Sequence, residues 1–75
     1  MAKRIESEDQ KMAVRANRVG SLRKALNLTQ QEIGDVMGLS SSAVSQRLRG
    51  QIPFKAQELE KLASFANTDV GWFER

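Results

Sequence analysis

Residues 29–50 constrain the fold of this chain more than any other segment does. Thr29 and Glu32 make the pattern of a helix capping box, in which the two side chains close the first turn. Gly38 ends this helix, because glycine enters a left-handed turn at no steric cost. Between these signals, apolar residues recur at helical spacing, namely Ile33, Val36 and Met37. The pattern predicts a short amphipathic helix with a defined beginning and end.

A second short helix is predicted directly after this one. Ser40 or Ser41 caps it, it runs to about Arg49, and Gly50 stops it. Gly34 faces this helix without a side chain, so the two helix axes can approach closely. Their crossing angle is expected to depend on a small core that consists of Ile33, Met37, Leu39, Val44 and Leu48. Two short helices joined by a tight turn are the pattern of a helix-turn-helix.

Helical periodicity also dominates the flanking segments. Ser7 and Gln10 make a capping pattern before a helix near 8–26, and Asn27 is its predicted end. The inward face of this helix is predicted to carry Met12, Ala16, Val19, Leu22 and Leu26.

After Gly50 the sequence predicts two more helical segments. A helix over 55–66 closes at Asn67, and its inward residues are Leu59, Leu62, Ala63 and Ala66. Thr68 and Asp69 then cap a last short turn that carries Val70, Trp72 and Phe73. We expect Trp72 and Phe73 to plug the core or to form a dimer contact. The predicted fold is all-α, a compact five-helix domain over residues 1–75.

Length and composition exclude several kinds of protein. A fold of 75 residues buries only about 60% of the surface of its unfolded chain, which disfavours a deep substrate cavity. The absence of His and Cys excludes zinc fingers, disulfide frameworks, thiolate nucleophiles and histidine general bases. We therefore expect no enzyme, no cofactor and no small-molecule substrate. With no signal peptide and no apolar run of about 20 residues, no membrane contact is expected and the cytoplasm is the predicted location.

The positive charges are unevenly distributed. The net charge is +3, and the stretches 11–24 and 47–55 contain basic residues but no acidic ones. Such stretches suit a polyanionic partner, although two solvated helix faces explain the charge pattern equally well.

Residues 29–50 strongly resemble the helix-turn-helix of phage repressor and Cro proteins, and the similarity extends over roughly 15–74. The matching positions are Gln30, Ile33, Gly34, Gly38, Leu39, Val44 and Gly50. The resemblance implies a lambda-repressor-like fold and a sequence-specific regulator of transcription that binds double-stranded DNA. The chain departs from the family pattern in two ways: Gly34 replaces a usual alanine, and Arg47 then Leu48 replace an aliphatic and a polar residue. The second departure is compatible with a small rotation of the predicted third helix.

The resemblance makes the helix that ends near Arg49 the recognition helix, and Ser41, Ser42 and Gln46 match the family's base contacts. With Val44 and Leu48 inward, the outward face adds two residues, Ser45 and Arg49. Glutamine can read adenine, arginine reads guanine and serine accepts either.

Contacts to the DNA backbone are expected from a second group of residues. Gln30 matches the family position that holds a phosphate together with the start of its helix. The full expected set is Thr29, Gln30, Arg23, Lys24, Arg47 and Lys55. Lys3 and Arg4, in a flexible arm over 1–6, could also reach the DNA.

Each monomer is expected to read one half-site, and a homodimer would bind an inverted repeat. A chain of this length leaves no room for a separate dimerisation domain, so a Cro-like protein or small repressor in a bacterial host is the preferred interpretation. Two alternatives stay open. One is a helix-turn-helix module that binds a protein, as an antitoxin or antirepressor target does, through an apolar patch around Trp72 and Phe73. The other is a non-specific architectural DNA-binding protein.

Overall fold

The computed structural model describes residues 8–75, which form four α-helices and one short 3₁₀ helix. These elements are α1 (Glu8–Ala25), α2 (Gln30–Met37), α3 (Ser41–Leu48), α4 (Ala56–Ala66) and the 3₁₀ helix η1 (Val70–Glu74). The all-α prediction is confirmed, whereas the count of five helices needs correction because the last one is a 3₁₀ helix. A 3₁₀ helix needs only three residues per turn, which suits so short a segment. The predicted cap at Ser7 and the arm over 1–6 lie outside the described residues.

The predicted signals at the ends of α2 and α3 are confirmed. Thr29 Oγ1 accepts the backbone N–H of Glu32 at 3.0 Å, and the Glu32 carboxylate accepts the N–H of Thr29 at 2.8 Å. Gly38 ends α2 in the left-handed conformation with a φ of 77°. Ser40, rather than Ser41, caps α3, because its hydroxyl accepts the N–H of Ala43 at 3.1 Å. The tight turn therefore follows from local side-chain chemistry.

Two asparagines in the left-handed conformation follow the longer helices. Asn27 and Asn67 both have a φ of 58°, a conformation that asparagine tolerates better than most residues. Leu26 lies beyond the last residue of α1 and is 44% exposed, so the prediction that it faces inward is wrong. Ala66, the last residue of α4, is only partly buried.

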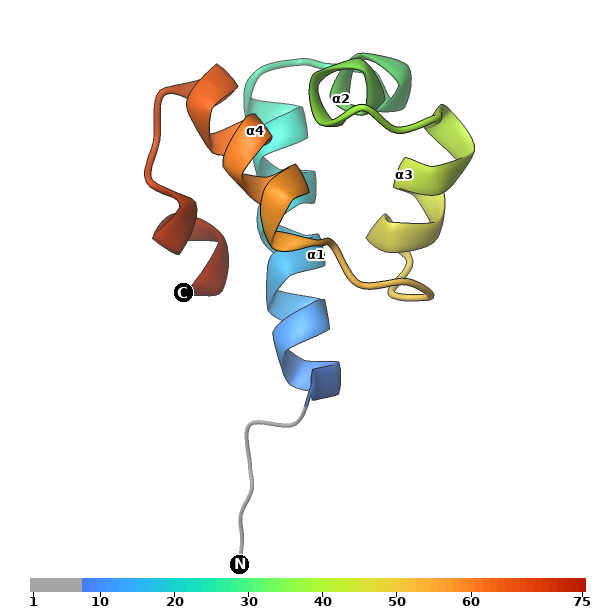
Figure 1. Cartoon of the computed structure of the whole chain (residues 1–75), viewed down its shortest axis with the longest axis vertical. Coiled ribbons are helices and arrows are strands. Elements are labelled where there is room, and N and C mark those ends of the chain that lie inside the picture. The colour runs from blue at the N-terminus through green and yellow to red at the C-terminus, as the bar shows by residue number, and fades with distance from the viewer. Residues whose placement is uncertain (1–7) are drawn as a thin grey trace, which may run out of the picture.

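The core lies where α1 meets the other helices (Figure 1). All five elements and the loop before α4 contribute to it, through Val19, Ile33, Met37, Val44, Phe54, Leu59, Leu62, Ala63 and Phe73. In Figure 1, α2 and α3 lie on one side of α1, and η1 lies on the other. The first turns of α1 project beyond the other helices, so Met12, predicted to face inward, is only partly buried and lies outside this cluster.

Gly34 is the point of closest approach between α2 and the turn that leads to α3. A Cβ atom at this position would lie 2.4 Å from the backbone oxygen of Leu39 and 3.4 Å from the Val44 side chain. Even an alanine would therefore require the Leu39 carbonyl to shift. The expected close approach at Gly34 is confirmed.

We expect Gly34→Val to lower the free energy of unfolding by about 1–3 kcal/mol, because the added side chain overpacks the turn. Gly20 supplies a matched control in α1, since a Cβ atom there meets nothing within 4 Å. Gly20→Val is expected to change the free energy by at most about 0.5 kcal/mol. Urea unfolding followed by circular dichroism measures both, and equal midpoints would contradict the role given to Gly34.

Candidate nucleic-acid interface

One side of α3 carries polar side chains that remain accessible, and α3 itself lies at the edge of the molecule (Figure 1). Ser41 and Ser42 in its first turn are exposed, and Ser45 and Gln46 in the next turn are partly buried. Arg49, directly after the helix, is exposed. Residues at these spacings lie along one helix face. The structure thus brings the five predicted base-contact residues together, and we call this surface the α3 polar face.

The start of α2, a helix that packs against α3, offers hydrogen-bond donors. Gln30 is the first residue of α2 and is partly buried, while Thr29 before it is exposed. Thr29 Oγ1 accepts a hydrogen bond within the cap, so its hydroxyl proton remains able to donate. The first N–H groups of a helix also lack partners within the helix and carry partial positive charge. These groups together are suited to hold an anion.

Two basic residues at the end of α1 lie near the end of α3. Arg23 and Lys24 line a shallow hollow of about 360 Å³ together with Leu48. Lys24 is exposed, whereas Arg23 is partly buried and donates from Nη1 to the backbone oxygen of Leu28 at 2.8 Å. Arg23 therefore stabilises the loop between α1 and α2, whether or not it also contacts a ligand.

Lys55 follows the loop that connects α3 to α4. Its side chain is exposed, and it occupies the position directly before the first residue of α4. Gly50 turns this loop away from α3 with a φ of 80°. An accessible ammonium group is thus available at the start of α4.

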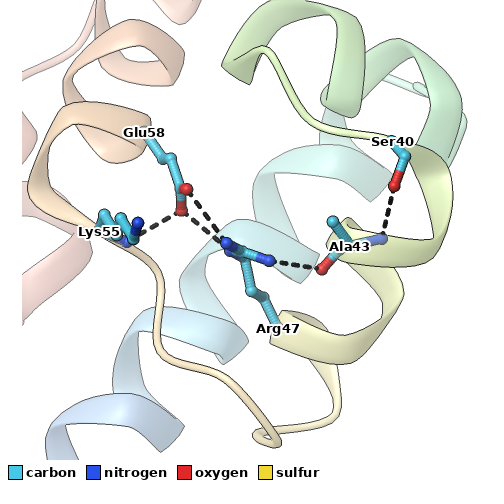
Figure 2. A network of polar contacts seen from close by, with 5 residues as sticks. All are labelled: Ser40, Ala43, Arg47, Lys55 and Glu58. Carbon is cyan, nitrogen blue, oxygen red and sulfur yellow. Dashed lines mark hydrogen bonds and ion pairs between the residues drawn. The ribbon is translucent and has the colours of Figure 1, made fainter.

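Arg47 is the one predicted phosphate contact that the structure places in the interior. The residue is 8% exposed, and its guanidinium donates from Nε and Nη2 to the two carboxylate oxygens of Glu58 at 3.0 and 3.3 Å. Its Nη1 donates to the backbone oxygen of Ala43 at 3.1 Å (Figure 2). Arg47 occupies the position where the resemblance implies an aliphatic residue. Because its guanidinium is buried with these partners, it is not accessible at the surface. Leu48, predicted to be buried, is only partly buried, so α3 turns Val44 and Arg47 inward.

Glu58 is the polar residue that sequence reasoning missed. It is 7% exposed, pairs with Arg47, and accepts the backbone N–H of Lys55 at 2.9 Å. A glutamate three residues after a helix cap is a capping-box position, which is the signal that could have found it. An arginine at a position that usually holds an aliphatic residue is the second signal, because a buried arginine requires an acidic partner.

The aromatic pair near the end of the chain belongs to the packing between α1 and η1. Phe73 is fully buried, and Trp72 is partly buried with its ring centroid 5.2 Å from that of Phe73. The guanidinium of Arg18 lies 5.1 Å from the Trp72 ring centroid, and Arg15 pairs with Glu74 at 3.0 Å. The prediction that these aromatic residues plug the core is confirmed, and both arginines hold η1 on α1.

Within residues 8–75, no helix is long and apolar enough to span a membrane. Among residues 10–75, whose side chains the structure describes, no three acidic side chains are grouped so that they could hold a metal ion.

Residues 19–73 match the HTH_3 family, which is described as helix-turn-helix. No curated protein matches the chain.

Two solved structures share the fold. An HTH_3 family transcriptional regulator from Vibrio cholerae is 24% identical with a TM-score of 0.78, over 89% of this chain and 38% of the regulator. A hypothetical transcription factor, NHTF, from Neisseria is 20% identical with a TM-score of 0.79, over 100% of this chain and 86% of that protein. This chain thus spans little more than a third of the Vibrio cholerae regulator.

Proposed function

Because the chain belongs to the HTH_3 helix-turn-helix family, we propose that it binds double-stranded DNA sequence-specifically and regulates transcription. In this proposal it is a binding protein of the Cro or small-repressor kind rather than an enzyme, and it acts in a bacterial cytoplasm. The observation that carries the proposal is the α3 polar face, which gathers five hydrogen-bonding side chains on one accessible side of a short helix.

The α3 polar face has the chemistry of a reader of base edges. The major groove is about 12 Å wide and admits one α-helix. Gln46 can bind adenine through two hydrogen bonds, and Arg49 can do the same with guanine. Ser41, Ser42 and Ser45 are short and can donate or accept, which suits water-mediated contacts.

Groups around α3 supply the contacts to the DNA backbone. Gln30 and Thr29 at the start of α2 would hold one phosphate together with the free N–H groups of the helix. Lys24 and Lys55 are exposed cations, and Arg23 retains donors beyond its bond to Leu28. Such contacts position the protein on the duplex without reading its sequence.

We further propose that two copies bind an inverted repeat. Helix-turn-helix dimers place their recognition helices about 34–36 Å apart, one turn of the double helix. Each copy would then read one half-site with its α3 polar face.

Selection from a random duplex library tests the proposal, followed by titration of the selected duplex and a random duplex. We expect an inverted repeat, bound at least about 10³-fold more tightly than random DNA. Binding without any enriched sequence would support the architectural alternative and overturn the specific one. An absence of binding would favour a protein partner. An exposed apolar patch around Trp72 and Phe73 would favour this alternative, but Phe73 is fully buried and Trp72 is partly buried with Arg18 over its ring.

Lys55→Ala is expected to weaken binding to all duplexes alike and to reduce the slope of log affinity against log salt by about one unit. The reason is that the Lys55 ammonium would release one counterion from the DNA. Lys61→Ala is a matched control, since Lys61 is exposed on α4 with its ammonium beside Gly38 at the end of α2. Titrations at several salt concentrations measure the slope. An unchanged slope for Lys55→Ala would remove this residue from the phosphate contacts.

A further inference from the structure

We propose that the buried Arg47–Glu58 pair determines sequence discrimination, by setting the rotation of α3 and so the direction in which the α3 polar face points. The inference rests on the DNA-binding function proposed above. Neither residue is offered as a DNA contact, and both are positioning residues.

The pair lies in a continuous path of hydrogen bonds from the start of α3 to the start of α4 (Figure 2). Ser40 accepts from Ala43, whose carbonyl accepts from Arg47. Arg47 donates to Glu58, which in turn accepts the backbone N–H of Lys55. The path links the cap of the recognition helix to the residue that would bind a phosphate.

The pair also joins α3 directly to α4. The backbone of α3 packs closely on α1 and α2, while its approach to α4 is looser. The long Arg47 side chain bridges this distance and meets both oxygens of Glu58. A planar guanidinium held at two points fixes direction as well as distance, which one apolar contact does not.

A small rotation of α3 is enough to disturb base readout. A helix with its side chains is about 10–12 Å across, so a rotation of about 20° moves the end of a side chain by about 2 Å. Hydrogen bonds between nitrogen and oxygen form only at separations of about 2.7–3.2 Å. Val44 is the one fully buried apolar residue of α3, and Leu48 packs against the core only in part, so apolar packing alone defines this rotation weakly.

The effect of the pair on discrimination between duplexes can be separated from its effect on stability by removing both charges together. A buried ion pair replaced by apolar residues of similar size often leaves a fold as stable as before. We therefore compare Arg47→Met/Glu58→Leu with Arg15→Met/Glu74→Leu, which removes the more exposed pair between α1 and η1 in the same way. Both double variants keep the net charge of the chain. Each is measured by urea unfolding and by its affinity for the selected duplex and for a scrambled duplex of equal composition.

We expect Arg47→Met/Glu58→Leu to bind the scrambled duplex within about twofold of the unmodified chain. Its affinity for the selected duplex should fall by about tenfold or more, the value of one well-formed base contact. The amide chemical shifts of α3 should change as well. The control variant Arg15→Met/Glu74→Leu should leave the affinity for both duplexes unchanged. Discrimination that stays within about twofold of the unmodified chain would overturn the inference.

If the double variant does not fold, Glu58→Gln takes its place, since it keeps an acceptor for the Lys55 N–H and removes the charge. Reduced discrimination in Glu58→Gln supports the inference, and full discrimination overturns it. If the unmodified chain itself fails to discriminate, the proposed function falls and this inference falls with it, an outcome that the unmodified chain alone reveals.

Discussion

Arg47→Met, made alone, is expected to lower the free energy of unfolding by about 3–5 kcal/mol. Glu58, which is 7% exposed in the unmodified chain, loses the guanidinium that neutralises its carboxylate. Domains of this size are stabilised by only about 5–10 kcal/mol in total, so the loss is a large share. Urea unfolding followed by circular dichroism provides the measurement, and restoring stability with Glu58→Leu in the same chain would show that the uncompensated charge is the cause.

Arg15→Met is the matched control for this prediction. It breaks the pair with Glu74, whose two side chains are 26% and 44% exposed. Exposed ion pairs contribute at most about 1 kcal/mol, because water screens the charges and the side chains lose freedom. Similar unfolding midpoints for the two single variants would refute the structural role assigned to the Arg47–Glu58 pair.

Gln46→Ala is expected to cost about 1–3 kcal/mol of binding free energy on the selected duplex and to relax preference at one base pair. Gln46 lies on the α3 polar face and can form two hydrogen bonds with an adenine. The measurement is a titration against the selected duplex and against duplexes altered at one base pair at a time.

Gln57→Ala serves as the control for base readout, because Gln57 is an exposed glutamine on α4, outside the α3 polar face. It is expected to leave the preference unchanged at every position of the duplex. An equal loss of affinity on all duplexes for Gln46→Ala would assign this side chain to the DNA backbone instead.

Much of the fold was predictable because its signals are local. The capping box of Thr29 and Glu32, the left-handed Gly38 and the Ser40 cap each depend on residues within a few positions of one another. Gly34 was predictable as a point of close approach because a tight turn brings neighbouring segments together whatever the rest of the chain does. In the same way, the Ser40 cap fixes where α3 begins. The beginning of the helix in turn decides which residues share the α3 polar face.

The errors concern residues whose environment comes from distant parts of the chain. Leu26 fits the apolar period of α1, but the helix ends one residue earlier and leaves it exposed. From the sequence, Arg47 is expected to contact a phosphate because it lies close along the chain to other expected contacts. Its partner is eleven positions away on another helix, and no periodicity within α3 indicates that pairing.

The sequence by itself determined where α2 and α3 begin and end, since caps and left-handed residues act over one turn of backbone. Only the tertiary structure decided which way α3 faces. Val44 and Arg47 are buried, while Leu48 packs against the core only in part, because Glu58 on α4 compensates a charge that could not otherwise be buried. Such compensation depends on the distance between two side chains in space, and that distance exists only after the helices have packed.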